Sequence, residues 1–344
     1  MSRSIMLKED LSKKTKTFAD VETKAYEYEG ACKDFLVKNI ASNLWANSED
    51  CTLSWNHTAN GVPETTTMPA SSWALSQLSI KLGMPSGYAE KCIERKHPDL
   101  AAENLNTWLA EQGSGKKPAN MLLRSYNDQL RACLSDRFTA FDTTQILDVI
   151  KRTINVDDYH IVGSYLSEER MHLRMIRDEL LDVDGEDLYP GIFIDSSDVG
   201  RTAFHISFGI WKKVCTNGLC INKIGGVLYH QKHMGITSLE VETEMAARIK
   251  TIPELIARSE AVIKAARTEK IDFKDEKIFE RMVNDIRRLS KVSEEDAKAV
   301  IELSQSRYGN TRWGVVNAMT EVAQKFELDD RIRIENAAGR LITM

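Results

Sequence analysis

The spacing of apolar residues changes along this chain, and that change constrains the fold class more than any motif does. In the middle of the chain apolar side chains occupy alternate positions, most clearly at Phe204, Ile206, Phe208 and Ile210. A period of two predicts strands with one buried face. From residue 240 almost to the end, apolar residues recur every three or four positions, which predicts helices. We therefore expect an α+β fold in which a central antiparallel β-sheet is flanked by an N-terminal helical region and a C-terminal helical tail.

Composition divides the chain into four segments. Residues 1–30 are polar and rich in Lys and Glu, and they predict a peripheral N-terminal arm. Residues 31–118 predict a mostly helical region that ends in a linker containing Gly, Ser and Lys. Residues 119–239 predict the antiparallel β-rich core, and residues 240–344 predict the C-terminal helical region.

Local signals predict where several elements begin and end. Ser71 precedes a run of helically spaced apolar residues that stops at Gly83, as a serine-capped helix with a glycine end would. Asp142 starts a capping-box pattern in front of another helix. The segments 159–166 and 171–177 are separated by a short polar turn and predict a β-hairpin.

A second hairpin is predicted around Asn217-Gly218, which is typical of a two-residue type I′ turn. With that loop, Lys212 would face Lys223 on the opposite strand. Like charges directly opposite one another are destabilising unless solvent or an anion separates them. The hairpin is therefore a candidate anion-binding element, and a solvated hairpin is the alternative.

The sign of the charge switches near residue 200. Residues 178–200 carry eight acids and no Lys or Arg, and residues 201–239 carry five basic residues and no acid. The acids are Asp178, Glu179, Asp182, Asp184, Glu186, Asp187, Asp195 and Asp198. Segregated charge creates a directed field, which recruits charged partners or clamps one part of a protein onto another. Neutralisation of the basic hairpin by the acidic segment stays an alternative to a binding role.

The strand predicted over residues 201–213 gives the binding hypothesis its residues. Opposite its apolar face it carries an aromatic ring, a His and cations, with small residues between them. Bases of a single strand stack on such rings while cations hold the phosphates, and stacking contributes about 1–3 kcal/mol per base. The predicted nucleic-acid-binding residues are Arg201, His205, Trp211, Lys212, Lys213 and Lys223, with Arg131 and Arg137 as phosphate anchors from a neighbouring strand.

We predict no cofactor, no metal site and no catalytic residue. The spacing of two cysteines and two histidines departs from that of tight zinc sites; these are Cys215, Cys220, His230 and His233. Three acids resemble the start of a calcium loop but lack its later ligands, so a surface turn is favoured over a divalent-ion site; these are Asp182, Asp184 and Asp187. Phosphate-binding glycine motifs and a nucleophile elbow do not occur.

The bulk properties favour a cytoplasmic protein. Its formal net charge of −5 argues against a generic DNA coat, although phosphate attraction acts over only about 8–10 Å and a local site remains compatible with it. No apolar run approaches the roughly 20 residues of a membrane span, and the N-terminus lacks an apolar signal core. Six scattered cysteines are typical of reduced thiols rather than of a disulfide frame.

Four sequence blocks together resemble a phage/plasmid-like family of conserved proteins of unknown function, found on prophages and mobile elements. The blocks are WALSQL with KLGMP at 73–85, RACLSDRF at 131–138, VCTNGL at 214–219 and WGVVNAMTE at 313–321. Phe138 departs from the Tyr that the resemblance implies. The resemblance covers about residues 68–340 and implies a mobile-element context in a bacterial host cell, with no chemistry to transfer. At the level of fold alone, a small sheet flanked by helices is also similar to annealing recombinases.

The leading hypothesis is a non-catalytic phage or plasmid DNA-binding protein that prefers single strands and assists recombination or replication. Its expected partners are single-stranded DNA, a further copy of the chain, or a replication or defence protein of host or phage, and not a membrane. One alternative is a protein-interaction module whose acidic block inhibits a host defence or nucleic-acid enzyme. The other is a metal-dependent nuclease that uses Asp182, Asp184 and Asp187.

Overall fold

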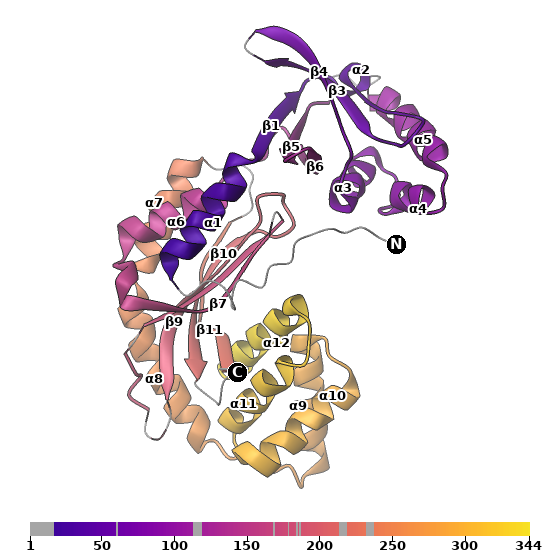
Figure 1. The fold of residues 1–344 in the computed structure, drawn as a ribbon. Coiled ribbons are helices and arrows are strands. Elements are labelled where there is room, and N and C mark those ends of the chain that lie inside the picture. Colours follow the sequence, from indigo (N-terminus) through magenta and orange to yellow (C-terminus); the bar gives the residue numbers. More distant parts are fainter. Residues whose placement is uncertain are drawn as a thin grey trace.

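The computed structural model describes residues 17–59, 61–112, 119–167, 169–177, 179–183, 185, 187–212, 219–231 and 237–344. For residues 219–228, 238 and 328 it describes the backbone alone. The described residues form two lobes (Figure 1). The described part of the chain starts on the C-terminal lobe with α1 (Phe18–Gly30), crosses to the N-terminal lobe and returns through α6 (Thr143–Thr153).

The N-terminal lobe contains two small antiparallel sheets and three helices of more than one turn. Its elements are β1 (Cys32–Val37), α2 (Ile40–Asn43), β2 (Leu44–Ala46), β3 (Leu53–Ala59), β4 (Val62–Met68), α3 (Ser72–Leu82), α4 (Tyr88–Glu94), α5 (Pro98–Glu111), β5 (Met121–Tyr126) and β6 (Gln129–Ser135). The sheets have the orders β1-β5-β6 and β2-β3-β4. Leu53, Trp55, Leu78, Leu105 and Leu123 are completely buried in the core that these elements share.

The C-terminal lobe is built on a five-stranded antiparallel sheet of order β11-β10-β9-β8-β7. Its strands are β7 (Tyr159–Leu166), β8 (Met171–Arg177), β9 (Leu188–Ser196), β10 (Phe204–Lys212) and β11 (Leu219–Gln231). Its later helices are α7 (Ser238–Ile249), α8 (Ile252–Thr268), α9 (Glu276–Ser290), α10 (Glu294–Leu303), α11 (Arg312–Ala323) and α12 (Leu328–Leu341), with short turns of other helix types at Val156–Asp158 and Ser304–Tyr308.

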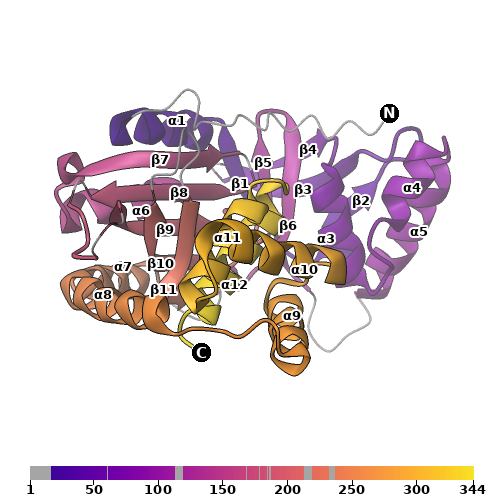
Figure 2. The same ribbon diagram turned by 90° about the horizontal axis from the view of Figure 1, so that it is seen from below.

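Helices lie on both sides of this sheet. Figure 1 shows α1, α6, α7 and α8 along one side and α9–α12 along the other, and Figure 2 shows the same arrangement from below. The predicted α+β class with an antiparallel sheet and helices at both ends is confirmed. No helix in the described part of the chain is both long enough and apolar enough to cross a bilayer.

The predicted core face of β10 is also confirmed. Phe204, Ile206, Phe208 and Ile210 expose at most 1% of their surface and belong to the main core. The opposite face is less open than its small residues suggest. The Phe193 ring of β9 fills the space beside Gly209, where an added Cβ would lie 2.1 Å from the ring. The glycine is therefore covered by a neighbouring strand and leaves no gap for a ligand.

The helix and hairpin signals are confirmed at several positions. Ser71 caps α3 by accepting from the Ala74 amide, and Gly83 ends the helix with φ 81°. Asp142 caps α6 through a capping box, because both reciprocal side-chain bonds are present. The first predicted hairpin is β7 paired with β8.

The segment boundaries differ from the four predicted segments in two places. Residues 18–30 are not a peripheral arm: they form α1, whose Phe18, Val21 and Ala25 are buried against the C-terminal lobe. Their spacing of three and four residues supplies an apolar stripe that the polar composition concealed. Strands β5 and β6 pair with β1 and so complete the N-terminal lobe instead of belonging to the later sheet. Residues 31–118 consequently combine strands with helices.

The register of the second hairpin also differs from the prediction. Ile206 faces Tyr229 as a simple hairpin about Asn217-Gly218 would require, but Lys212 faces Leu219 and not Lys223. Irregularities on both sides of Ser207 shift the pairing within the strand. Strand β11 carries extra residues there, including two glycines, and glycine inside a strand is typical of a bulge. The Lys212–Lys223 argument for an anion therefore does not apply.

Candidate functional site

The two lobes meet at residues 197–202, which we call the junction loop. Its Val199 is completely buried beside Leu134 of the N-terminal lobe. The Val199 carbonyl accepts from the Trp73 indole at 3.1 Å and from the Gln77 amide at 2.8 Å, both on α3. The loop is therefore fixed to the opposite lobe through its backbone and through one apolar side chain.

Arg124 of β5 connects its own strand to the start of α6 and to the junction loop. Its guanidinium donates to both carboxylate oxygens of Asp142, at 2.7 and 2.5 Å, and to Asp34 at 2.8 Å. It also donates to the Asp198 carbonyl at 2.7 Å. Arg124 is 3% exposed, and these acids raise its pKa against the opposing effect of burial. A buried arginine with this many partners holds β5, the start of α6 and the junction loop in one geometry.

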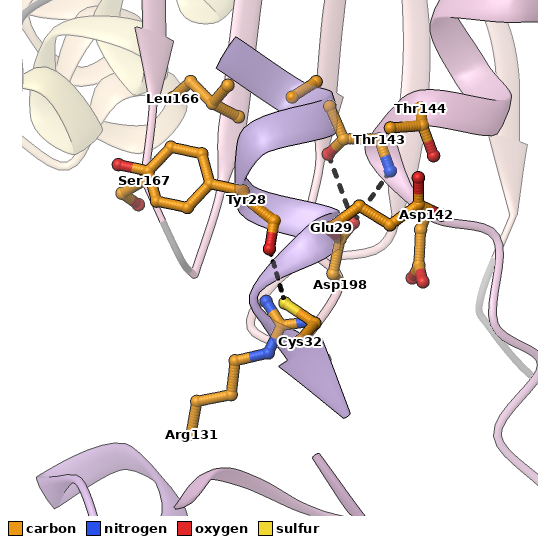
Figure 3. A pocket seen from close by; sticks show the side chains of 11 residues that line it. Tyr28, Glu29, Cys32, Arg131, Asp142, Thr143, Thr144, Leu166, Ser167 and Asp198 are labelled. Atoms are coloured by element: carbon orange, nitrogen blue, oxygen red, sulfur yellow. Dashed lines mark hydrogen bonds between the residues drawn. The ribbon is translucent and has the colours of Figure 1, made fainter. Parts of the chain in front are cut away.

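A pocket, which we call the junction pocket, opens near Arg124 between α1, β6 and the start of α6. It encloses about 360 Å³ of empty space, part of it open to solvent. Its polar lining contains one cation, several neutral groups and three acids; these are Arg131, Tyr28, Cys32, Thr143, Thr144, Ser167, Glu29, Asp142 and Asp198. Figure 3 shows the Arg131 guanidinium ending beside Cys32, with Asp198 hydrogen-bonded to Thr143 behind it.

Two groups of the junction pocket have shifted pKa values. Burial and the neighbouring Asp142 raise the pKa of Asp198 to about 6, although Arg131, Arg124 and the bonds from Thr143 act in the opposite direction. Burial raises the pKa of the Cys32 thiol to about 11, so that thiol stays protonated and donates to the Tyr28 carbonyl at 3.1 Å. The pocket thus combines one cation, Arg131, with three carboxyl groups, of which Asp198 titrates near neutral pH.

Next to Val199 the junction loop carries Arg201 to the surface of the N-terminal lobe. The Arg201 guanidinium lies over the Trp73 ring at 5.3 Å from its centroid and also pairs with the buried Glu169. Its side chain is 41% exposed. Phe138 is half-buried in the same apolar cluster as Trp73, and the preceding Arg137 is exposed. We call Trp73, Arg137, Phe138 and Arg201 the junction face.

A second buried cluster, the sheet network, lies between the five-stranded sheet and α12. Asp195 accepts from Arg170 at 2.9 Å and from His172 Nδ1 at 2.8 Å. Arg174 Nε donates to His172 Nε2 at 2.8 Å, and Arg174 also pairs with Glu335 of α12. Because an arginine only donates, Nε2 must accept and His172 is neutral with its proton on Nδ1. Burial accordingly lowers the pKa of His172.

The other predicted contact residues of the sheet do not lie with the junction face. Lys212 points inward: its ammonium donates to Asn317 of α11 at 3.0 Å and lies over the Trp313 and Tyr308 rings, at 5.7 and 5.8 Å. Trp211 is half-buried, with its ring 5.7 Å from that of Tyr189. These contacts place both side chains against protein groups.

The predicted nucleic-acid-binding residues therefore do not form one surface. His205 stacks on His230 at the other end of β10, seven residues from Lys212, which is about 23 Å of strand. Lys213 lies outside the described residues, and only the backbone of Lys223 is described. Of the two predicted anchors, Arg131 is buried in the junction pocket and Arg137 is exposed on the junction face.

The acidic segment does not form one surface either. Asp182 pairs with Lys264 on the exterior, whereas Asp195 and Asp198 belong to the two internal clusters. Asp184, Cys215 and His233 lie outside the described residues. Within the part of the chain that the structure describes, no three His, Cys, Asp or Glu residues are grouped as metal ligands, and Cys32, Cys51, Cys92 and Cys133 are free thiols.

Sequence patterns missed the sheet network, although one signal for it was present. His172 and Arg174 alternate with Leu173 and Met175 in β8, which indicates a strand with one polar face. A polar face covered by a helix needs internal partners, and Asp195 directly opposes His172 on the next strand. Arg124 and Trp73 gave no comparable signal, because their partners come from distant parts of the sequence.

Comparison with known proteins gives a family without an assigned activity. No curated protein and no solved structure matched the chain. One family model, described as Domain of unknown function (DUF932), matches residues 132–340, which include the end of β6, the junction loop and the whole five-stranded sheet. That match spans more than half of the sequence, so the chain belongs to the DUF932 family.

Proposed function

We propose that this protein binds single-stranded DNA at the junction face, as a non-catalytic phage or plasmid protein of recombination or replication. The observation that carries the proposal is the contact of Arg201 with Trp73, in which a cation of one lobe lies over an aromatic ring of the other. Both side chains are partly accessible. A base that stacks on Trp73 and a phosphate that reaches Arg201 would therefore contact both lobes at once.

The neighbouring residues extend this surface. Phe138 offers a second half-buried ring and Arg137 a second exposed cation, so rings and cations are interleaved as in single-strand-binding grooves. Arg201 uses one of its nitrogens for Glu169, and a guanidinium has five donor hydrogens in all. A phosphate can thus bind Arg201 without displacing Glu169.

Arg131, the cation in the lining of the junction pocket, would supply a further subsite for a phosphate of the same ligand. It lines the junction pocket with Thr144 and Ser167, whose hydroxyls can donate to a phosphate that enters. The junction loop links the pocket to the junction face, because Asp198 lies in the former and Arg201 in the latter. The resemblance of the four sequence blocks to phage and plasmid proteins supports a mobile-element context for this activity.

Fluorescence anisotropy with labelled oligo-dT and with a matched duplex, each at two salt concentrations, tests the proposal. We expect tighter binding to the single strand and a steep loss with salt. Arg137→Ala and Arg201→Ala should each lower the slope of log affinity against log salt by about one. Trp73→Ala should cost about 1–3 kcal/mol of binding, while Trp73→Phe, which keeps a stacking ring, should cost less.

Lys274→Ala/Lys277→Ala is the matched control, since it removes two exposed cations beside and on α9, away from the N-terminal lobe. Equal losses in this control and in Arg137→Ala/Arg201→Ala would reduce the binding to bulk charge and refute the junction face. No binding of DNA combined with recovery of a specific host protein would favour the interaction-module alternative. Magnesium-dependent cleavage of the oligonucleotide would favour the nuclease.

A further inference from the structure

We propose that His205 and His230 form a binding site for a borderline-soft divalent metal ion, of the class of Zn²⁺ or Cu²⁺, on the five-stranded sheet. The two residues are direct partners across β10 and β11. Their rings lie 4.2 Å apart between centroids and are inclined by 35°. This site is separate from the junction face and does not depend on the proposed DNA binding.

The spacing of the ring nitrogens fits a shared metal. His230 Nδ1 lies 3.0 Å from Nδ1 and 3.2 Å from Nε2 of His205. Two nitrogens bound at about 2.0–2.1 Å to a tetrahedral metal lie about 3.3 Å apart. The backbone therefore already holds the imidazoles at nearly the distance that chelation requires, and the broad χ2 preference of histidine lets the rings turn toward a common ion.

Both imidazoles are at least partly accessible to solvent. His230 is exposed and His205 is half-buried, so a bound metal would keep solvent positions. The register irregularity starts directly after Ile206, and bulges of this kind often re-aim side chains beside functional sites. A metal ion binds imidazole in its neutral form through a ring nitrogen.

The two nitrogen donors determine which metal ions can bind. Asp195 directly opposes His205 on β9, but it is occupied by Arg170 and His172 and is not counted as a ligand. Nitrogen donors exclude hard cations, so Mg²⁺ and Ca²⁺ should not bind, and Cu²⁺ should bind most tightly among the first-row ions.

Calorimetric titration of the full-length chain with ZnCl₂, CuCl₂ and MgCl₂ tests the site. We expect one Zn²⁺ or Cu²⁺ per chain and no Mg²⁺. His205→Gln and His230→Gln should each weaken binding by at least the roughly 10–100-fold that loss of an outer-shell partner costs at metal sites. His97→Gln, at an exposed histidine before α5, should leave the affinity unchanged. Electron paramagnetic resonance of the Cu²⁺ complex should show nitrogen ligands that disappear in the double variant.

Two results would overturn the assignment. Unchanged Zn²⁺ and Cu²⁺ affinity in His205→Gln is the first. The second is loss of binding in Cys215→Ser/Cys220→Ser together with full binding in His205→Gln, which would assign the metal to the cysteines. Circular dichroism of every variant separates loss of the site from loss of the fold.

Discussion

The two buried polar clusters of this protein use similar residues and reach opposite electrostatic outcomes. In the sheet network, Asp195 faces Arg170 and a histidine, and its pKa is depressed. In the junction pocket, Asp198 faces two arginines as well, yet its pKa is raised to about 6. The difference lies in a second carboxylate: Asp142 lies close to Asp198, and the Arg124 that could neutralise Asp198 is already bound to Asp142 by two bonds.

The sheet network is a structural charge cluster, whereas the junction cluster contains a carboxyl that can still bind or release a proton. The sheet network is closed on itself, since its guanidinium and carboxylate groups bind one another and its central residues His172, Arg174 and Glu335 are at most 3% exposed. The junction cluster borders a pocket and keeps a carboxyl whose charge changes near neutral pH. Perturbed pKa values beside a cavity are typical of functional sites, whereas closed networks are typical of packing.

The largest effect is expected from a substitution that disrupts the sheet network. Glu335→Ala should lower the free energy of unfolding by about 3–5 kcal/mol, because it leaves Arg174 buried without its carboxylate. Arg331, which also donates to Glu335 at 3.0 Å, loses its partner as well. Urea denaturation monitored by circular dichroism measures the loss. Glu335→Gln, which keeps the shape and an acceptor, should lose less.

A cost below about 1 kcal/mol for Glu335→Ala would contradict the closed network, since that is the value of an exposed pair. It would mean that α12 can move and admit water to Arg174. Hydrogen exchange of the α12 amides distinguishes this movement, because an opened helix would lose protection.

A smaller effect with a distinctive pH dependence is expected at the junction. The folded-state pKa of Asp198 is about 6 and its ordinary value is 3.8. A raised pKa means that the folded state binds the proton more tightly, so this contribution to stability is present below pH 3.8 and is lost as the pH rises through 6. The pKa rises by about two, and each step of one corresponds to about 1.4 kcal/mol of folding free energy. The contribution of Asp198 is therefore about 3 kcal/mol at most, because the pocket admits some water.

Asp198→Asn removes this titration while its amide oxygen can still accept from Thr143. The stability of the variant relative to the natural protein should therefore rise by about 2 kcal/mol between pH 4 and pH 7.5. Urea denaturation over this range measures it. A difference that is constant with pH would show that Asp198 has an ordinary pKa. Asp195 gives the opposite sign, because its depressed pKa contributes stability above pH 3.8 that is lost as the pH falls.

Sequence patterns predicted the local part of this fold well. The caps at Ser71 and Asp142 and the apolar face of β10 follow from interactions within a few residues or from a period of two, so they are visible in the sequence. The prediction that residues 31–118 are mostly helical fails at its start, where Cys32–Val37 form β1. Pairing with β5, far along the chain, outweighs the local helical spacing there.

The candidate site was less predictable, because its residues come from both lobes. The sequence predicts Arg201 on the accessible face of a strand over residues 201–213; it lies instead in the junction loop before β10, and its ring partner Trp73 lies 128 positions earlier. Trp211 and Lys212 were expected outside, and their partners Tyr189 and Asn317 belong to elements whose packing no periodicity encodes. Segregation of charge in the sequence did not become segregation in space for the same reason.

The smallest effect is expected at an ion pair that is exposed to solvent. Asp182 pairs with Lys264 at 2.9 Å, with side chains 81% and 50% exposed. Asp182→Ala should change the free energy of unfolding by less than about 1 kcal/mol, because water screens the pair and ordering two long side chains costs entropy. Lys264→Ala should have an effect of the same size, and the double variant should show little coupling in urea denaturation. A coupling as large as that of Arg174 with Glu335 would mean that charge alone, without burial, stabilises this lobe, and the contrast between the acidic segment and the sheet network would lose its physical basis.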